Sequence, residues 1–254
     1  MSEPILQTHK MTIRFGGLCA VSELDLTLGA GEIVGLIGPN GAGKTTVFNL
    51  LTGIYAPTEG SVYFCGKRID GLPPHRIAEL GIARTFQNIR LFTGLSVLEN
   101  VLIGGQRHGR QTLLDALLRN GRFLADEARQ RDEALSLLEV LGLAAVANDP
   151  APSLPYGHQR RLEIARALAA RPRLLLLDEP AAGMNPAESV ELLSLIRQVR
   201  DRFDLTILLV EHNMKVVMGV CDRVQVMDYG KSIALGTPEQ VRRDPRVIEA
   251  YLGD

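Results

Sequence analysis

The feature that most constrains the fold of this chain is a glycine-rich turn that ends in Lys44 and Thr45. Residues 38–45 fit the phosphate-loop pattern G-x-x-x-x-G-K-[ST] at every fixed position. The apolar residues 32–37 lead into the turn like a buried strand, and residues 46–51 lead out of it like a helix. In this context glycines let backbone amides converge on one point, and the helix N-terminus adds its positive dipole end. The pattern therefore predicts a site for a nucleoside triphosphate.

Two side chains of the turn have specific chemical roles in this hypothesis. The Lys44 ammonium would reach the β- and γ-phosphates, and the Thr45 hydroxyl would be a ligand of Mg²⁺. The alternative is a glycine-rich turn without a ligand, which explains neither side chain. The predicted nucleotide-binding residues of this segment are Gly38, Pro39, Asn40, Gly41, Ala42, Gly43, Lys44, Thr45 and Thr46.

A second signal is a pair of acidic residues, Asp178 and Glu179, directly after the apolar run at residues 174–177. Desolvating a carboxylate is costly, so two of them at the end of a buried strand indicate a use. In a phosphate-loop protein Asp178 would hold Mg²⁺, directly or through water, and Glu179 would polarise the water that attacks the γ-phosphate. The alternative is a strand that stops at solvent, where acids are common. Combined with the phosphate loop, the pair predicts hydrolysis of the triphosphate.

The composition of the chain limits its compartment and partners. Hydrophobic content of 46% and charged content of 22% over 254 residues are ordinary for a soluble globular protein. A formal net charge of −1 gives no support to a nucleic-acid surface. The sequence begins unlike a secretory signal, its 3 cysteines are far apart, and no apolar run approaches the ~20 residues that span a bilayer. We expect a cytosolic protein without nucleic-acid partners, and a partner chain must supply any membrane part.

The order of the predicted elements indicates an α/β fold. Short strands occupy residues 5–37, with clear alternation at 24–28, and a further strand is predicted at 61–64. Residues 88–110 read as a loop, and a helical region follows it. The later elements alternate between helix and strand, which favours a mainly parallel sheet flanked by helices. The predicted helices are residues 111–119, 125–141, 162–170, 187–200 and 215–220, and the later strands are residues 174–177, 205–210 and 223–227.

A third signal lies just before the strand at 174–177. Residues 154–168 resemble the signature L-S-G-G-Q and the basic helix that follow one another in ATP-binding cassette (ABC) ATPases. Other marks of this family occur in the family's order along essentially the whole chain. They are Phe15 at the position of the ring that stacks on adenine, Gln87 in the Q-loop, residues 181–185 in the D-loop, and His212 as the switch histidine.

The resemblance implies a fold and an assembly. We expect a single ABC ATPase domain over residues 1–254, with a phosphate-loop α/β core that has an antiparallel β portion at its N-terminus. The core would comprise residues 1–87 and 161–254, and residues 88–160 would form an inserted helical subdomain that includes the signature. Two subunits would dimerise head to tail, with each ATP between the phosphate loop of one and Tyr156 and Gly157 of the other.

The resemblance also implies roles in catalysis. Glu179, His212 and Gln87 would act in hydrolysis, and Thr45, Gln87 and Asp178 would hold Mg²⁺. Read alone, His212 could be a polar residue at a strand end, and Phe15 could belong to the core. Arg160 and Arg161 could be no more than a solvated helix face.

A closer resemblance is to the ATPases of bacterial branched-chain amino acid importers, carried by residues 13–18, 82–92, 178–186 and 236–253. It implies a second ATPase subunit, identical or paralogous, with two transmembrane permease subunits at the inner face of the cell membrane. A periplasmic solute-binding protein would take part indirectly. The ATPase of lipopolysaccharide export shares the helix after the signature and the Tyr-Leu-Gly ending, and is the nearest alternative. An importer of another small amino acid or amide is a further one.

Two departures from the broad family are Pro155, where it has Ser, and Asn185, where it usually has Asp. Two other classes of protein fit the sequence less well. A soluble ABC ATPase that acts on DNA or ribosomes would usually show a long coiled-coil insertion, two cassettes or a basic face. A phosphate-loop kinase has no use for a signature motif.

Overall fold

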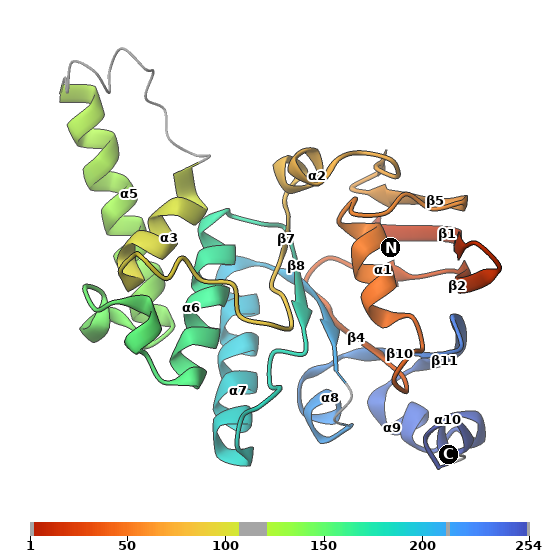
Figure 1. Ribbon diagram of the computed structural model, residues 1–254. Helices are drawn as coiled ribbons and strands as arrows, with labels where there is room; N and C mark the ends of the chain where they lie inside the picture. Colours follow the sequence, from red (N-terminus) through yellow and green to blue (C-terminus); the bar gives the residue numbers. More distant parts are fainter. Residues whose placement is uncertain (1–2, 107–120, 212–213, 253–254) are drawn as a thin grey trace. The chain divides into compact units, whose positions relative to one another are not determined.

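The computed structural model describes residues 3–106, 121–211 and 214–252 (Figure 1). The chain folds into two compact units. The first comprises Met1–Arg84 and Arg173–Asp254, and the second comprises Thr85–Pro172. The helix predicted at residues 111–119 lies outside the described residues.

Within the described part of the first unit, a six-stranded sheet has the order β11-β10-β4-β9-β8-β7. Neighbouring strands from β10 to β7 are parallel, and β11 pairs antiparallel with β10. This confirms the predicted mainly parallel sheet. Strands β4, β8 and β9 are buried at every position, which explains why their sequences show apolar runs without alternation. The strands are β4 (Ile33–Ile37), β7 (Ile82–Arg84), β8 (Leu174–Asp178), β9 (Thr206–Val210), β10 (Arg223–Asp228) and β11 (Lys231–Gly236).

An antiparallel sheet forms the N-terminal part of the first unit, as predicted. Its strands are β1 (Leu6–Phe15), β2 (Leu18–Leu24), β3 (Thr27–Leu28), β5 (Glu59–Phe64) and β6 (Lys67–Arg68). The alternation at residues 24–28 is present in the burial of the side chains, but it is divided between two strands, because β2 ends at Leu24 and β3 begins at Thr27. The buried Thr8 hydroxyl donates to the Leu24 carbonyl at 2.7 Å and accepts from the Leu26 amide at 2.9 Å. These backbone groups therefore pair with a side chain, and the strand is interrupted.

Helix α1 (Lys44–Leu51) packs between the two sheets of the first unit (Figure 1). Its Phe48 side chain shares one buried cluster with Met11 of β1 and Leu36 of β4. The opposite face of β4 contacts α8, since a Cβ at Gly35 would lie 3.3 Å from Val217 Cγ1. Side chains of adjacent strand residues point to opposite faces, so α1 and α8 cover different faces of the sheet. The other helices of this unit are α2 (Pro74–Leu80), α7 (Pro186–Phe203), α8 (Met214–Val220), α9 (Pro238–Arg242) and α10 (Pro245–Leu252).

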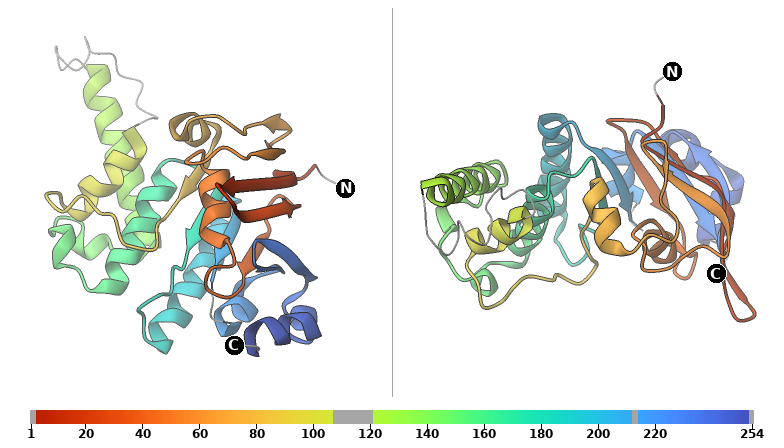
Figure 2. Two further views of the ribbon diagram at one scale, coloured as in Figure 1. Left: turned by 45° about the vertical axis from the view of Figure 1, so that its right-hand side comes forward. Right: turned by 90° about the horizontal axis from the view of Figure 1, so that it is seen from above.

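The second unit is helical, with α3 (Val97–Gly105) lying against both α5 (Gly121–Val140) and α6 (Tyr156–Ala169) (Figure 2). The prediction of a loop over residues 88–110 is wrong for α3. A capping box starts this helix, with Ser96 accepting from the Glu99 amide and Glu99 accepting from the Ser96 amide. Helix α6 begins at Tyr156 rather than at residue 162. Among the helices that the structure describes, none is both long and apolar enough to cross a bilayer.

Candidate active site

Several predicted site residues of the first unit lie at one edge of the parallel sheet, formed by the carboxyl ends of its strands. Val210 of β9 pairs with Leu36 of β4 on one side and with Asp178 of β8 on the other. The carboxyl ends of the three strands are therefore level. The phosphate-loop segment leaves β4 at this edge, and Glu179 leaves β8 there. Ligands of open α/β sheets bind at the carboxyl ends of the strands.

Two glycines of the phosphate loop have no room for a side chain. Gly38 has φ +155°, and a Cβ there would lie 2.1 Å from the Met227 carbonyl oxygen. Gly43 has φ +97°, and its Cβ would lie 2.5 Å from the Ala20 carbonyl oxygen. Gly43 is also the N-cap of α1 and caps it with no side chain, so the amides of the first turn are available to an anion.

The Lys44 side chain is buried inside this loop, with 7% of its surface exposed. Its Nζ donates to the carbonyl oxygens of Gly38 at 2.7 Å and Pro39 at 2.8 Å. Burial lowers the pKa of the Lys44 ammonium, while the nearby carboxylates of Glu179 and Asp178 act to raise it. The two carboxylates are therefore near enough to the Lys44 ammonium to interact with it electrostatically. A site that binds both phosphates and a metal needs positive and negative groups close together in this way.

The two acids after β8 are held in different ways. Asp178 is buried, and its Oδ2 accepts from Arg84 Nη2 at 2.9 Å. Glu179 has a left-handed backbone with φ +46°, and its amide donates to the Val210 carbonyl at 2.9 Å. A non-glycine residue in this conformation is strained, and such residues cluster at functional sites. Strand β8 thus ends at Asp178, and the backbone turns at Glu179.

A third acid at this edge, Glu211, was missed from the sequence. It follows β9, is 1% exposed, and its Oε1 accepts from the Ala181 amide at 3.2 Å. A carboxylate directly after the apolar residues 207–210 was the signal, as a carboxylate after residues 174–177 was for Asp178. The adjacent His212 lies outside the described residues, so its role as the switch histidine stays a prediction.

The residues after Glu179 end in the N-cap of α7. The Asn185 Oδ1 accepts from the Glu188 amide at 2.9 Å, and Glu188 Oε2 accepts from the Asn185 amide at 3.0 Å. This capping box uses the side chain that departs from the family pattern.

Phe15 stands at the hairpin between β1 and β2, and 44% of its surface is exposed. The alternative that placed it in the core is therefore wrong. Its ring meets the Tyr55 ring edge-on, with 5.2 Å between the centroids. Tyr55 is a second exposed aromatic residue that no sequence motif indicated. Thr45 is exposed and Thr46 is half-buried at the start of α1.

In the second unit a buried ion pair ties the signature helix to the segment of Gln87. Arg160 is fully buried and donates from Nη1 to Glu163 Oε2 at 2.8 Å and to the Phe86 carbonyl at 2.7 Å. Its Nη2 donates to the Gln87 carbonyl at 2.8 Å. The Phe86 amide in turn donates to Glu163 Oε1 at 3.3 Å. The interpretation of Arg160 as part of a solvated helix face is wrong.

Two of the three predicted ligands of this unit are exposed. They are Gln87 and Tyr156, whereas Gly157 is half-buried. Pro155 is the N-cap of α6, with φ −54° and ψ 151°, and it provides no side-chain cap. The first turn of α6, which holds Tyr156 and Gly157, therefore begins without a hydrogen-bonding side chain at its cap.

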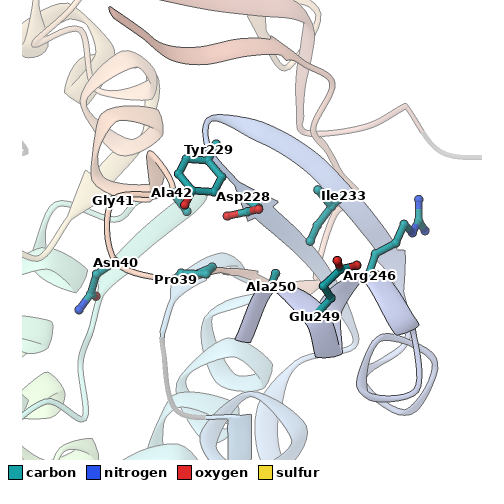
Figure 3. A pocket seen from close by; sticks show the side chains of 10 residues that line it. All are labelled: Pro39, Asn40, Gly41, Ala42, Asp228, Tyr229, Ile233, Arg246, Glu249 and Ala250. Atoms are coloured by element: carbon teal, nitrogen blue, oxygen red, sulfur yellow. The ribbon is translucent and has the colours of Figure 1, made fainter. Parts of the chain in front are cut away.

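A cavity of about 480 Å³ lies beside the phosphate loop in the first unit (Figure 3). Its lining includes four loop residues but none of Lys44, Thr45, Asp178 and Glu179, so it is not the place where the charged groups converge. The lining residues are Pro39, Asn40, Gly41, Ala42, Asp228, Tyr229, Ile233, Arg246, Glu249 and Ala250.

The donors at the sheet edge suit ATP and Mg²⁺. The glycine cradle brings backbone close to where phosphates would lie, and Lys44 supplies the compact positive charge. Among the described residues no group of three or more His, Cys, Asp and Glu side chains could hold a metal on its own. Mg²⁺ is usually bound by one or two protein oxygens together with phosphate oxygens and water. The Thr45 hydroxyl and the Asp178 carboxylate are donors of that kind.

Comparison with known proteins finds relatives that match this chain over its full length. A family model described as ABC transporter matches residues 21–182, and one described as branched-chain amino acid ATP-binding cassette transporter matches residues 231–254. The chain is 49% identical to the high-affinity branched-chain amino acid transport ATP-binding protein LivG of Escherichia coli (strain K12), over 100% of both chains. It is 36% identical to the lipopolysaccharide export system ATP-binding protein LptB of Haemophilus influenzae, over 98% of each chain.

Solved structures show the same fold. An ATP-binding cassette of an ABC transporter in its ADP conformation matches with a TM-score of 0.86 and 31% identity, over 100% of both chains. A dimeric cassette in a post-hydrolysis state, bound to ADP and Pi, matches with a TM-score of 0.76 and 25% identity, over 92% of this chain and 98% of that one.

Proposed function

This chain belongs to the ATP-binding subunits of ABC transporters, and we propose that it hydrolyses ATP to power the import of branched-chain amino acids. The similarity to LivG over the full length supports this solute, and so does the match of residues 231–254 to the branched-chain family model. The lower identity to LptB gives lipopolysaccharide export less support. The observation that carries the enzymatic part is the convergence of Lys44, Asp178 and Glu179 at the carboxyl edge of one parallel sheet.

Transport needs partner chains. ABC ATPases of this kind act in transporter complexes and dimerise. For this chain we propose a second ATPase subunit, identical or paralogous, and two transmembrane permease subunits. A periplasmic solute-binding protein would deliver the solute, and the ATPase would lie at the inner face of the cell membrane. In this assembly residues 1–87 and 161–254 act as the nucleotide-binding core, and residues 88–160 act as a helical subdomain.

The proposed roles at the nucleotide follow from the donors. The loop amides and Lys44 bind the phosphates, and the exposed Phe15 ring stacks on adenine with Tyr55 beside it. Thr45, Asp178 and Gln87 hold Mg²⁺, which neutralises charge on the phosphates when it is bound. Tyr156 and Gly157 contact the nucleotide of the second subunit.

Glu179 and His212 act on the reacting water in this proposal. Glu179 holds and polarises the water that attacks the γ-phosphate, and it accepts that water's proton. The left-handed backbone at Glu179 sets the position from which its side chain extends. A small rearrangement of this turn would therefore move the carboxylate and lower turnover without preventing nucleotide binding. In the same proposal His212 supports this step.

Glu179→Gln tests the hydrolytic role. The amide keeps the size of the side chain and removes the base, so we expect ATP binding to persist while turnover falls by ~10²-fold or more. The closed dimer should then accumulate in Mg-ATP, which size-exclusion chromatography detects. Glu127→Gln removes an exposed carboxylate of α5 and serves as the matched control. A Glu179→Gln protein that stays monomeric and hydrolyses ATP at the wild-type rate rules out the role.

The solute needs a separate experiment. The ATPase is reconstituted with its membrane subunits and binding protein in vesicles, and ATP-dependent uptake of leucine is measured. We expect uptake that unlabelled isoleucine and valine inhibit. Uptake of another amino acid or amide in place of leucine would correct the solute and leave the ATPase assignment intact.

A further inference from the structure

Arg84 makes contacts in the first unit that no part of the proposed mechanism uses. It ends β7, its side chain is 7% exposed, and it forms an ion pair with Asp178, which is 4% exposed. Its Nη2 donates to Asp178 Oδ2 at 2.9 Å. Its Nη1 donates to Asn49 Oδ1 at 2.7 Å and to Thr52 Oγ1 at 3.4 Å. The guanidinium also lies over the Phe48 ring, 5.3 Å from the centroid, where the ring face attracts a cation.

These contacts join the elements that carry two of the three proposed Mg²⁺ ligands, Thr45 and Asp178. Phe48 and Asn49 belong to α1 and Thr52 is its C-cap residue, whereas Asp178 ends β8. Asn49 is four residues after Thr45, so the two side chains lie on the same face of α1, one turn apart. One planar side chain therefore bridges the helix of Thr45 to the carboxylate of Asp178.

We propose that Arg84 is a positioning residue for Mg²⁺, and this rests on the function proposed above. By binding Oδ2 it fixes the plane of the Asp178 carboxylate, so that Oδ1 presents to the metal in one orientation. By binding Asn49 it fixes the distance between α1 and β8, and with it the separation of the Thr45 hydroxyl from the carboxylate. A guanidinium suits both tasks, because its rigid fork donates in two directions from one plane.

Two other roles make different predictions. If Arg84 only supports packing, its loss lowers stability and leaves the Mg²⁺ requirement of nucleotide binding unchanged. If Arg84 competes with the metal for Asp178, its loss makes Mg²⁺ bind more tightly. A positioning residue differs from both, because its loss makes Mg²⁺ bind more weakly while binding of metal-free nucleotide persists.

The experiment uses Arg84→Lys and Arg84→Met in the Glu179→Gln background, where bound ATP is not consumed. A fluorescent ATP analogue is titrated in EDTA, and dimer formation with ATP is followed as Mg²⁺ is raised. Mn²⁺ binding to the ATP complex is measured separately by electron paramagnetic resonance. We expect unchanged binding in EDTA and a Mg²⁺ midpoint raised by about 10-fold or more, since groups that hold a metal ligand in place typically contribute that much. The Mn²⁺ affinity should fall by a similar factor.

Arg68→Met is the matched control, because Arg68 and Asp70 form an arginine–aspartate pair in which the arginine is 61% exposed. It should leave both midpoints unchanged. Should Arg84→Met fail to fold, Asn49→Ala removes one anchor of Arg84 and keeps the ion pair, and we expect a smaller shift in the same direction. A folded Arg84 variant whose Mg²⁺ midpoint is unchanged or lower overturns the proposal. Absence of both nucleotide binding and Mg²⁺-dependent dimer formation in the Glu179→Gln parent would instead contradict the proposed function itself.

Discussion

The carboxyl edge of the parallel sheet and the junction of the Gln87 segment with α6 both contain buried charges, but the charges serve different ends. At the sheet edge Lys44, Asp178 and Glu179 share one environment in which a ligand can be bound. At the junction Arg160 and Glu163 are directed at the backbone of Phe86 and Gln87. The charges of the first region are placed to bind a ligand, and those of the second hold the backbone of the Gln87 segment against α6. Substitution of Lys44 should therefore mainly alter nucleotide binding, and substitution of Arg160 should mainly alter stability.

Arg160→Met should give the largest effect and test the second half of this contrast. It leaves the Glu163 carboxylate buried without its cation, and breaking a buried pair in this way typically costs about 3–5 kcal/mol. Urea unfolding measures the loss, with the neighbouring Arg161→Met as the control. Replacing both partners, as Arg160→Met with Glu163→Leu, should recover part of the stability, because no charge then stays buried. A wild-type unfolding curve for the single variant would show that the pair does not hold this segment.

Lys44→Ala tests the first half. The ammonium is the compact charge proposed to bind the β- and γ-phosphates, and each charge-assisted hydrogen bond contributes about 1.5–3 kcal/mol. Two such bonds correspond to a loss of affinity for ATP on the order of 100-fold or more, which nucleotide titration measures. The unfolding curve should stay close to that of the wild type. Near-normal affinity would contradict the assignment of the phosphate loop.

Pro155→Ser has a smaller expected effect and sharpens the role of the first turn of α6. The backbone at Pro155 is extended, which serine can adopt at an N-cap. A hydroxyl facing the γ-phosphate of a second subunit would add a charge-assisted bond of about 1.5–3 kcal/mol, so ATP-driven dimerisation should tighten. Dimer affinity in the Glu179→Gln background decides this. An unchanged or weaker dimer would mean that the position is not a phosphate ligand in this chain.

Phe92→Asp should have the smallest effect on the isolated subunit. The ring is 46% exposed, and the Phe92 backbone is held on both sides by the buried Asn100 side chain, at 2.9 and 3.1 Å. We expect the isolated ATPase rate to be unchanged and the unfolding free energy to move by less than about 0.5 kcal/mol. Transport by the assembled complex should fall, because an exposed apolar loop residue is suited to contact the membrane subunits. A large loss of thermal stability would instead show that the Phe92 ring stabilises the fold, through its contact with the Arg166 guanidinium 5.4 Å from the ring centroid.

The contrast between the two regions also explains what the sequence predicted. The strand, loop and helix around Lys44 are contiguous, and Asp178 directly follows its strand, so local patterns located both. Alternation of helices and strands was enough to indicate the parallel sheet. Helix α3 was missed because its apolar residues end in a glycine pair, although the capping box at Ser96 was visible.

Local sequence patterns could not predict contacts between residues that lie far apart in the sequence. The ion pair of Arg84 and Asp178 joins residues 94 positions apart, and the bond from Arg160 to the Phe86 carbonyl joins residues 74 apart. Helical periodicity did not show which of two adjacent arginines faces inward. Glu163, three residues after Arg160, was the one local signal of a pair. The pairing of Tyr55 with Phe15 depends on the approach of two separate turns, which no motif encodes.

The capping box of α7 determines which kind of surface this chain can meet at Asn185. The Oδ1 atom already accepts the Glu188 amide, so what the side chain adds relative to an aspartate is its amide N–H₂ group. Asparagine and aspartate cap a helix about equally well, so the exchange leaves the start of α7 intact. It reverses the polarity of the outward contact, however, from acceptor to donor. A hydrogen-bond acceptor opposite this position would satisfy the asparagine, whereas a donor suited to aspartate would meet a second donor.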